Sequence, residues 1–500
     1  MEKRTILVTG ATGYVGGRLV PLLLRQGYVV RCMARDPRKL AGRWDDTVNS
    51  EGQLEIVSGD VLKPETLSAA LAGVDAAYYL IHAMGDGEAG FVEREKQSAL
   101  DFARSAAEQR VGRIIFLGGL GRRGTKTSDH LHSRHQTGDL LRSGSVPVTE
   151  LRAATIVGAG SASFEMLRHL TEKLPIMVCP RWIETRTQPI SIEDTLAYLI
   201  AALENPDTAG RVLDIGGPDV LTYRDMMQTY AAVKGLRRLI ITAPVLTPRL
   251  SAYWVNLMTP IPASIAFPLI EGLKTETICE NDDAGRLMPL ALTTFRDSVA
   301  RAIRATDELE VPTRWTGAHR GAVPLAFDAA AIPTRALLRD EQTVTTSASA
   351  KALRLALSRI GGAVGWYYAD WLWVIRGALD RLFGGVGLRR GRRHPEHIAV
   401  GDAIDFWRVE EFTPNRIRLR AEMMVPGRAW LEFQIRDDSE HGRELVQTAY
   451  YEPNSFWGRL YWFALIPIHY FVFRGMARGI VRWAEQQAVI QPSSAVRLRP

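Results

Sequence analysis

The stretch VTGATGYVGGRLV at residues 8–20 decides the fold of the N-terminal part of the chain. Its three glycines lie between an apolar run and an apolar helical pattern. The first glycine permits a tight turn, the second lets a ligand approach the backbone, and the third lets helix and strand pack closely. The helix N-terminus then offers free N–H groups and a positive dipole to a pyrophosphate. The expected dinucleotide contacts of this turn are Gly10, Thr12, Gly13, Tyr14, Val15 and Gly16.

Strand and helix patterns alternate along the first 160 residues of the chain. Short runs rich in β-branched residues are separated by helical patterns, which is typical of parallel strands joined by helices. We therefore predict an α/β fold, a doubly wound parallel Rossmann sheet. The predicted strands cover residues 4–10, 29–35, 54–60, 75–83, 113–119 and 146–158, with clear helical patterns at 16–27 and 93–110.

The residues after the second strand, ARDPRKL at 34–40, indicate which dinucleotide is bound. An acidic side chain at this point holds the ribose 2′-hydroxyl of NAD. Here Arg35 comes first, and a guanidinium suits a 2′-phosphate through forked, charge-assisted hydrogen bonds. The sequence therefore favours NADP, while Asp36 keeps NAD open as the alternative.

Further cofactor contacts are expected where the third, fourth and fifth strands end. Asp60 and Val61 of SGDVL are predicted to meet the adenine, although a helix cap by Asp60 is an equal alternative. His82 of YLIHAM is predicted to face the nicotinamide ribose, with a structural histidine as the alternative. Gly118 of FLGG completes the set, because ligands lie at the carboxyl ends of strands in such sheets.

Together, TGATGYVG, ARDP, GDV, FLGG and LRAATIVGAG give the first 300 or so residues a family resemblance. This part is similar to an atypical, extended-type short-chain dehydrogenase/reductase, near the NmrA-like and NAD(P)H-binding subgroups. The resemblance implies that the strand leading to Gly158 passes beside the nicotinamide. These motifs together are specific for the superfamily and only weakly specific for any one reaction.

The resemblance also implies a catalytic serine, a tyrosine and a lysine four residues after the tyrosine. The corresponding stretch, GLGRRGTKTSDHLHSRHQTGDLLRSG at 119–144, contains no tyrosine. His130 takes the tyrosine position and Arg134 the lysine position, with Ser133 just before it. These three residues are our predicted catalytic group.

Three alternatives stay open for this stretch. In the first, His130 or His132 donates a proton while Arg134 holds the ribose and phosphate, because an imidazole does acid work near neutral pH. In the second, the site binds NADPH without turnover, as NmrA-like regulators are understood to do. In the third, hydride transfer occurs and water or the substrate delivers the proton.

The composition changes toward the C-terminus, where eight of the twelve tryptophans lie at or beyond Trp366. Period-2 alternation over residues 401–438 and a long aromatic helical pattern over about 455–486 predict a separate antiparallel α+β domain. The stretch LYWFALIPIHYFVFRGM resembles a family of unknown function found fused behind such reductases. By analogy we expect a START/Bet v 1-like helix-grip fold, which encloses a hydrophobic cavity. The stripe Trp457, Tyr461, Trp462 and Leu465 is expected to line that cavity, with the alternative that these side chains only fill the core.

Composition and charge exclude several other classes of protein. The net charge of +7 comes from 62 basic and 55 acidic residues, so we expect no nucleic-acid partner. The three cysteines have no metal-site or disulfide spacing, so no metal is expected. The chain opens with MEKRTILVTG and runs straight into a strand, from which we infer no signal peptide and a cytoplasmic location. The cluster GLRRGRRHPEH at 387–397 is a solvated loop or, alternatively, an anion or membrane-surface contact.

Two apolar segments, 253–273 and 460–473, bear on membrane contact. The first holds three prolines and the second has only fourteen residues, whereas a spanning helix needs about twenty. We interpret both as walls of a lipophilic pocket or as docking surfaces, which keeps a membrane-peripheral location open.

The sequence thus predicts an NADPH-dependent oxidoreductase for a hydrophobic carbonyl, enone or quinone-like substrate. Its C-terminal domain is expected to bind a lipophilic, lipid-like ligand. The alternative is a non-catalytic NADP(H)-sensing binding protein of the NmrA-like type, and the sequence does not fix the oligomeric state. The predicted domains are residues 1–305, with substrate-side insertions from about 160, a linker at 306–340, and residues 341–490.

Overall fold

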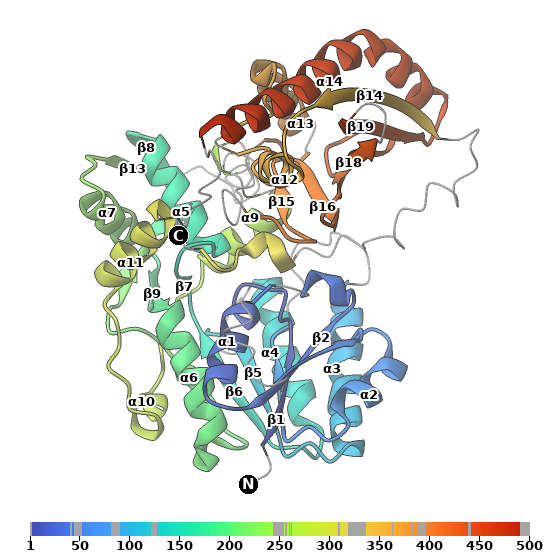
Figure 1. Cartoon of the computed structure of the whole chain (residues 1–500). Coiled ribbons are helices and arrows are strands. Elements are labelled where there is room, and N and C mark those ends of the chain that lie inside the picture. The colour runs from blue at the N-terminus through green and yellow to red at the C-terminus, as the bar shows by residue number, and fades with distance from the viewer. Residues whose placement is uncertain are drawn as a thin grey trace, which may run out of the picture. The chain divides into compact units, whose positions relative to one another are not determined.

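The chain divides into two compact units, Met1–Arg320 and Gly321–Pro500, which are described separately (Figure 1). His82 and most of the predicted linker lie outside the described residues. The computed structural model describes residues 3–40, 43–44, 53–81, 91–121, 128–243, 255, 258–259, 261, 263–308, 311–318, 337–362, 364–382, 385–388, 397–438 and 442–490.

The first unit is built on a seven-stranded sheet of order β11-β6-β5-β4-β1-β2-β3. All its neighbouring strands pair in parallel, which confirms the predicted Rossmann-like sheet. Each of the six predicted strands has its counterpart in the sheet. The bounds are β1 (Thr5–Thr9), β2 (Val29–Ala34), β3 (Leu54–Ser58), β4 (Ala76–Tyr79), β5 (Arg113–Gly119), β6 (Val148–Ala153) and β11 (Val212–Ile215).

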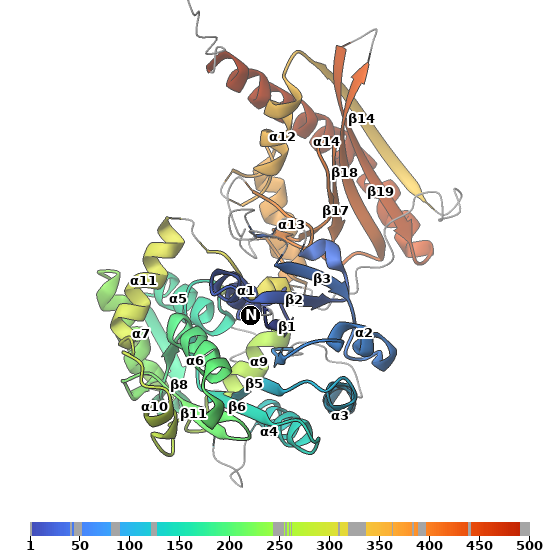
Figure 2. The ribbon, with the colours of Figure 1, turned by 60° about the horizontal axis from the view of Figure 1, so that its bottom comes forward.

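Helices cover both faces of this sheet because the strands are apolar on both sides. Ile6 and Val8 pack in one core cluster with α1 (Gly16–Arg25) and α6 (Ile192–Glu204). Leu7, between them, faces the opposite cluster, which includes side chains of α2 (Leu67–Leu71), α3 (Phe91–Glu108) and α4 (Asp129–Arg142). Figure 2 shows α1 and α6 on one side of the strands and α2 and α3 on the other.

The rest of the first unit forms a second group of small strands and helices with its own core cluster. The strand pairs are β7 (Ile156–Val157) with β10 (Ile190–Ser191), β8 (Ile176–Pro180) with β13 (Leu239–Ala243), and β9 (Arg186–Thr187) with β12 (Leu221–Thr222). The helices are α5 (Ala162–Lys173), α7 (Tyr223–Val233), α9 (Ala263–Gly272), α10 (Asp283–Leu287) and α11 (Phe295–Asp307). Short 3-10 helices are η1 (Pro37–Lys39), η3 (Pro64–Thr66), η4 (Arg181–Glu184), η5 (Pro206–Thr208) and η6 (Trp315–Ala318).

The second unit contains a six-stranded antiparallel sheet of order β14-β19-β18-β17-β16-β15. The long helix α14 (Phe456–Ile490) and α12 (Ala350–Ser358) pack against it. The helix α13 (Asp370–Leu382) follows α12 in the chain and precedes β15. This agrees with the predicted antiparallel α+β architecture. The strands are β14 (Leu338–Thr346), β15 (Ala403–Ile404), β16 (Trp407–Phe412), β17 (Arg416–Ala421), β18 (Gly427–Asp438) and β19 (Gly442–Pro453).

Aromatic side chains fill the core of the second unit. Trp366 stacks on Trp373 with ring centroids 5.0 Å apart, and Trp462 stacks on Tyr451 at 5.3 Å. The prediction that Trp457 lines a cavity is wrong, because this side chain is 71% exposed on α14. Among the described helices, none has an apolar stretch of the length and hydropathy that crossing a bilayer requires.

Candidate functional site

The glycine-rich turn between β1 and α1 has the geometry that its sequence predicts. Gly10 has a φ of +71°, and the Gly13 amide donates to the Gly10 carbonyl at 2.8 Å. A Cβ on Gly16 would overlap that same carbonyl, so both ends of the turn require glycine. The first turn of α1 carries no acidic side chain, which leaves its N-terminus open to an anion.

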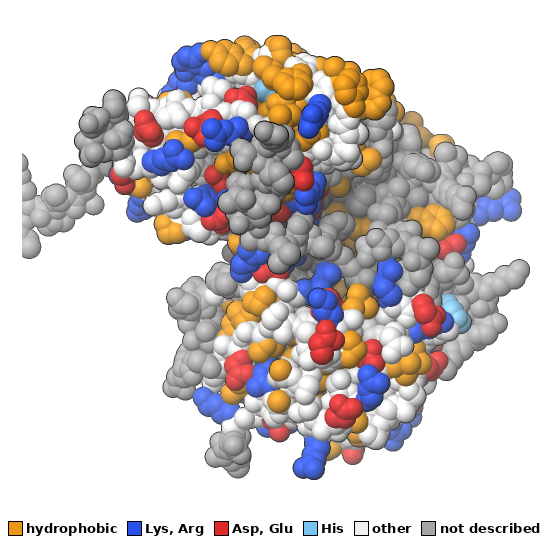
Figure 3. Space-filling model, turned by 90° about the vertical axis from the view of Figure 1, so that its right-hand side faces the viewer, with side chains coloured by type: hydrophobic (Ala, Val, Ile, Leu, Met, Phe, Trp, Pro, Cys, Tyr) orange, Lys and Arg blue, Asp and Glu red, His pale blue; other side chains and the backbone are white. Residues whose placement is uncertain are grey.

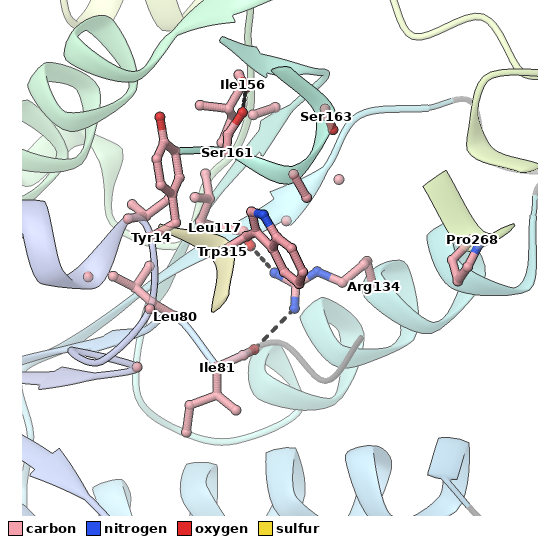
Figure 4. A pocket seen from close by; sticks show the side chains of 18 of the residues that line it. Tyr14, Leu80, Ile81, Leu117, Arg134, Ile156, Ser161, Ser163, Pro268 and Trp315 are labelled. Carbon is pink, nitrogen blue, oxygen red and sulfur yellow. Dashed lines mark hydrogen bonds between the residues drawn. The ribbon is translucent and has the colours of Figure 1, made fainter. Parts of the chain in front are cut away.

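A cavity of about 450 Å³ runs along the carboxyl ends of the central strands (Figure 4). It begins at the glycine-rich turn and continues past the ends of β2, β3, β4 and β5. All the predicted cofactor contacts within the described residues line it, and His82 lies outside those residues. The lining contacts are Gly10, Thr12, Gly13, Tyr14, Val15, Gly16, Arg35, Asp60, Val61 and Gly118.

Two residues at the end of β2, Arg35 and Asp36, are the candidates for deciding between NADP and NAD, and their surroundings differ. Arg35 is exposed and lines the cavity. The Asp36 carboxylate accepts two hydrogen bonds from the Arg38 guanidinium, both at 2.9 Å. Its hydrogen bond with Arg38 holds the pKa of Asp36 below its usual range. The acid that would bind a ribose 2′-hydroxyl is therefore engaged, while the arginine beside it faces the cavity.

Asp60 and Val61, the predicted adenine contacts, line the cavity just after the end of β3. The side chain of Val61 is buried and lines the cavity. The Asp60 carboxylate accepts from the Leu62 amide at 3.1 Å, within a local turn. The alternative that Asp60 caps a helix is wrong, because the N-cap of the next helix, η3, is Lys63.

Arg134 is the predicted catalytic residue whose side chain the structure places in the cavity. From α4 its guanidinium donates to the carbonyl of Leu117 and, at 3.2 Å, to that of Ile81 (Figure 4). Its Cζ lies 4.7 Å from the centre of the Phe116 ring. Burial lowers the pKa of Arg134, and the nearby Glu95 opposes that shift. The ends of β4 and β5 thus hold a desolvated positive charge at the cavity wall.

Ser133, the other predicted catalytic residue whose side chain is described, does not line the cavity with Arg134. Ser133 is buried and its hydroxyl donates to the Glu95 carboxylate of α3. His132 is exposed, which disfavours it as the proton donor. His130 belongs to α4, but its side chain lies outside the described residues. The N-cap residue Ser128 and the helix residues Leu131 and Arg134 line the cavity, a spacing of three residues that sequence similarity alone did not reveal.

A segment distant in sequence supports the glycine-rich turn from outside. The Thr313 hydroxyl donates to the Tyr14 carbonyl at 2.7 Å and accepts from Arg18 Nε at 2.9 Å. The Arg18 guanidinium lies 4.7 Å from the centre of the Tyr14 ring. Burial raises the pKa of the Tyr14 hydroxyl. Residues 311–318, which fall inside the predicted linker, therefore contact the turn directly.

Replacing Thr313 with valine is expected to weaken NADPH binding about threefold to tenfold. The substitution keeps the volume and removes two hydrogen bonds that hold the turn, each of which contributes about 1 kcal/mol. Fluorescence titration with NADPH measures the change. Thr306→Val is the matched control, because among the described residues its hydroxyl donates only to the Ala302 carbonyl, within α11. Equal losses in both variants would contradict this role of Thr313.

Beyond Arg134 the cavity becomes apolar. Pro268, Leu269 and Leu273 come from the predicted pocket-wall segment 253–273. Met166 of α5 and Trp315 of η6 complete this apolar wall. Neither was identified from the sequence, because no motif marks them and they reach the site only through the packing of the second group of helices.

Two family models match separate parts of the chain. A model described as NAD(P)H-binding matches residues 10–158, which contain the glycine-rich turn and Arg134. A second model, described as "Protein of unknown function (DUF2867)", matches residues 332–476 in the second unit. The cofactor class of the first unit is thereby identified as NAD(P)H.

Known proteins similar to this chain match its first part. The ceramide reductase of Caulobacter vibrioides is 28% identical over 244 residues, covering 48% of this chain and 73% of that protein. Cinnamoyl-CoA reductase 2 of Arabidopsis thaliana is 30% identical, but the match covers only 24% of this chain and 37% of that reductase. The solved triphenylmethane reductase of Citrobacter sp. is 21% identical with a TM-score of 0.47, covering 60% of this chain and 99% of that one. This chain therefore joins an NAD(P)H-binding Rossmann domain of the NmrA-like, short-chain dehydrogenase/reductase type to a C-terminal DUF2867 domain.

Proposed function

We propose that the protein is an NADPH-dependent reductase of a hydrophobic carbonyl, enone or quinone-like substrate. The observation that carries the proposal is the cavity itself, which joins the glycine-rich turn to the apolar wall formed by Met166, Leu269 and Trp315. A pocket with mainly apolar walls and few placed polar groups is the usual form of a small-molecule site. The names of the similar ceramide and cinnamoyl-CoA reductases are compatible with substrates of this class.

The preference for NADPH rests on the end of β2. Arg35 faces the cavity, and Lys39 also lines it. The Asp36 carboxylate is already bound by Arg38. The two cations, Arg35 and Lys39, together with an acid that is already paired with Arg38, favour a 2′-phosphate over a free 2′-hydroxyl. NAD stays the alternative in this proposal.

When bound, NADPH supplies a hydride to the carbonyl carbon or the enone β-carbon of the substrate. Arg134 binds the nicotinamide ribose from the ends of β4 and β5. Its charge, held where water is excluded, also stabilises the negative charge that develops on the substrate oxygen. We assign the proton that completes the reduction to His130, with water or the substrate as the alternative source.

Oxidation of NADPH in the presence of lipophilic aldehydes, enones and quinones tests the proposal. Turnover of at least one class supports it, and tight NADPH binding without oxidation across the panel would contradict it. That second result supports the alternative, an NADP(H)-sensing binding protein. The specific observation favouring the alternative is that α4 has no tyrosine and that Ser133 is bound to Glu95 rather than lining the cavity.

Replacing Arg134 with methionine is expected to lower kcat/KM by about 100-fold, because a preorganised charge at the reacting oxygen contributes on this scale. Arg134→Lys is expected to restore part of the activity, since it keeps the charge but not the planar fork. Steady-state kinetics with the best substrate of the panel measure both variants, and circular dichroism checks their fold.

His130→Ala should lower kcat if this residue supplies the proton, and an unchanged kcat would assign proton delivery to water or the substrate.

We further propose that the second unit has a START/Bet v 1-like helix-grip fold and binds a lipophilic ligand. What supports this is the antiparallel sheet with the long C-terminal helix α14 packed against it. Native mass spectrometry of the full chain tests it. A lipid-sized adduct that survives purification and is removed by organic extraction is the expected result.

A further inference from the structure

The second unit exposes a set of large apolar side chains on α14 and α13. On the first half of α14, Phe463 is 57% exposed and Phe471 is 53% exposed. On α13, Trp371 is 62% exposed. Figure 3 shows hydrophobic side chains gathered over α14 at the upper edge of the second unit. We call this set the apolar face; it comprises Trp371, Ile375, Leu379, Leu382, Phe456, Trp457, Leu460, Phe463, Ile466, Ile468, Tyr470 and Phe471.

The first half of α14 is apolar around most of its circumference. Only a narrow stripe, which includes Trp462, Val472 and Phe473, is buried against the rest of the unit. A helix that is hydrophobic on all sides normally buries all of its sides. Exposed apolar patches of this kind mark binding surfaces in proteins that are otherwise covered by polar groups.

The start of α13 and the middle of α14 form one surface. Tyr368, just before α13, contacts Phe471 with ring centroids 5.2 Å apart. Trp371 lies three residues later in the chain, in the first turn of α13. The exposed side chains of both helices therefore contribute to the same part of the second unit.

The charges on the α14 part of this surface are all basic. From Phe456 to Ala484 the chain contains no acidic residue, while Arg459 and Arg474 interrupt or follow the apolar stretch. On α13, Asp370 is exposed beside Trp371 and its carboxylate accepts from the Trp366 amide at 2.7 Å, whereas Asp380 is buried beneath Gly385 and Gly387. An apolar surface with aromatic side chains and a basic margin is complementary to an anionic, amphipathic occupant.

We infer that the apolar face docks on the surface of a phospholipid bilayer that contains anionic lipids. Tryptophan, tyrosine and phenylalanine are suited to the boundary between headgroups and acyl chains. Arginines at the margin are attracted to anionic headgroups and bury their stems along apolar surface. The stretch Phe456–Phe471 is roughly 24 Å long at about 1.5 Å per residue, whereas the hydrocarbon core is about 30 Å thick. The helix is therefore expected to lie in the interface.

A second copy of the chain is a poorer occupant. In a two-fold contact each patch meets itself, so the arginines of one copy would approach those of the other. Like charges brought together at an interface lower its stability. This occupant predicts a dimer in the absence of lipid, which makes it distinguishable by experiment.

Flotation of the full chain with vesicles tests the inference. We expect binding to vesicles of phosphatidylcholine with phosphatidylglycerol, weaker binding to phosphatidylcholine alone, and a loss of the difference at high salt. The triple variant Trp457→Glu, Phe463→Glu and Phe471→Glu is expected to lower the partition coefficient roughly tenfold or more, because three apolar contacts are replaced by charges that anionic lipid repels. Its NADPH affinity should stay unchanged, and circular dichroism checks that it remains folded, because Phe471→Glu also removes the ring contact with Tyr368.

A matched control places the same charges elsewhere. Ile176→Glu, Val178→Glu and Leu239→Glu change side chains of comparable exposure on β8 and β13 of the first unit. This control should float like the unchanged protein. The inference is overturned if the protein does not float, if both triple variants lose binding equally, or if light scattering shows a lipid-independent dimer that only the α14 variant dissolves.

Discussion

Replacing Gly10 with alanine is expected to lower the affinity for NADPH about 100-fold or more. Gly10 has a φ of +71°, a conformation that costs a side-chain-bearing residue about 1–2 kcal/mol. A Cβ there would lie 2.7 Å from the carbonyl oxygen of Leu80, which is backbone and cannot rotate away. The turn has to open, and the Gly13-to-Gly10 hydrogen bond that shapes the phosphate site is lost. Fluorescence titration with NADPH measures the effect.

Gly27→Ala is the control for backbone strain, because it places a side chain at a positive φ without changing the cavity at the glycine-rich turn. Gly27 has a φ of +88° at the end of α1, but nothing lies within 4 Å of its added Cβ. This variant should lose about 1 kcal/mol of unfolding free energy and keep its NADPH affinity. If both glycine variants bind NADPH equally well, the cavity at the turn is not the cofactor site. Thermal unfolding followed by circular dichroism shows whether Gly10→Ala keeps its fold.

Replacing Arg35 with alanine is expected to weaken NADPH binding about tenfold to a hundredfold and to leave NADH binding nearly unchanged. Hydrogen bonds between a guanidinium and a phosphate contribute about 1.5–3 kcal/mol, and only NADPH carries the 2′-phosphate. The ratio of the two dissociation constants, measured by titration at fixed ionic strength, is the relevant quantity. It is insensitive to a general loss of stability, because both cofactors share the rest of the site.

Arg25→Ala is the control for the change in net charge. Arg25 is exposed at the opposite end of α1 from the glycine-rich turn, so its removal should change neither affinity. If Arg35→Ala weakens NADPH and NADH equally, the assignment of the 2′-phosphate to this residue is wrong. In that case Asp36, despite its contact with Arg38, becomes the better candidate for contact with the ribose.

Much of the cofactor site is predictable because it consists of local geometry. The turn at residues 10–16 and Arg35 each follow directly from the strand that precedes them. In a parallel sheet the carboxyl ends of neighbouring strands meet at one edge, so residues at strand ends converge whatever the rest of the chain does. The same reasoning places Asp60, Val61 and Gly118 at the cavity.

The catalytic prediction was less complete because it depended on the rotation of a helix. Similarity aligned His130 and Arg134 with a tyrosine and a lysine four residues apart. The packing of α4 against β5 and α3 decides which of its faces meets the cavity. That packing presents Arg134 and turns Ser133 toward Glu95.

By itself, then, the sequence determined the glycine-rich turn, the parallel sheet and the basic residue at the end of β2, since each depends on neighbours in the chain. Only the tertiary structure decided that Thr313 holds the turn, that Trp315 closes the apolar wall, and that Trp457 faces outward. These outcomes depend on contacts between residues as much as 299 positions apart, or on which side of a helix the core covers. Neither is encoded in a local pattern, because an aromatic or hydroxyl side chain has the same sequence signal whether it packs inward or remains exposed.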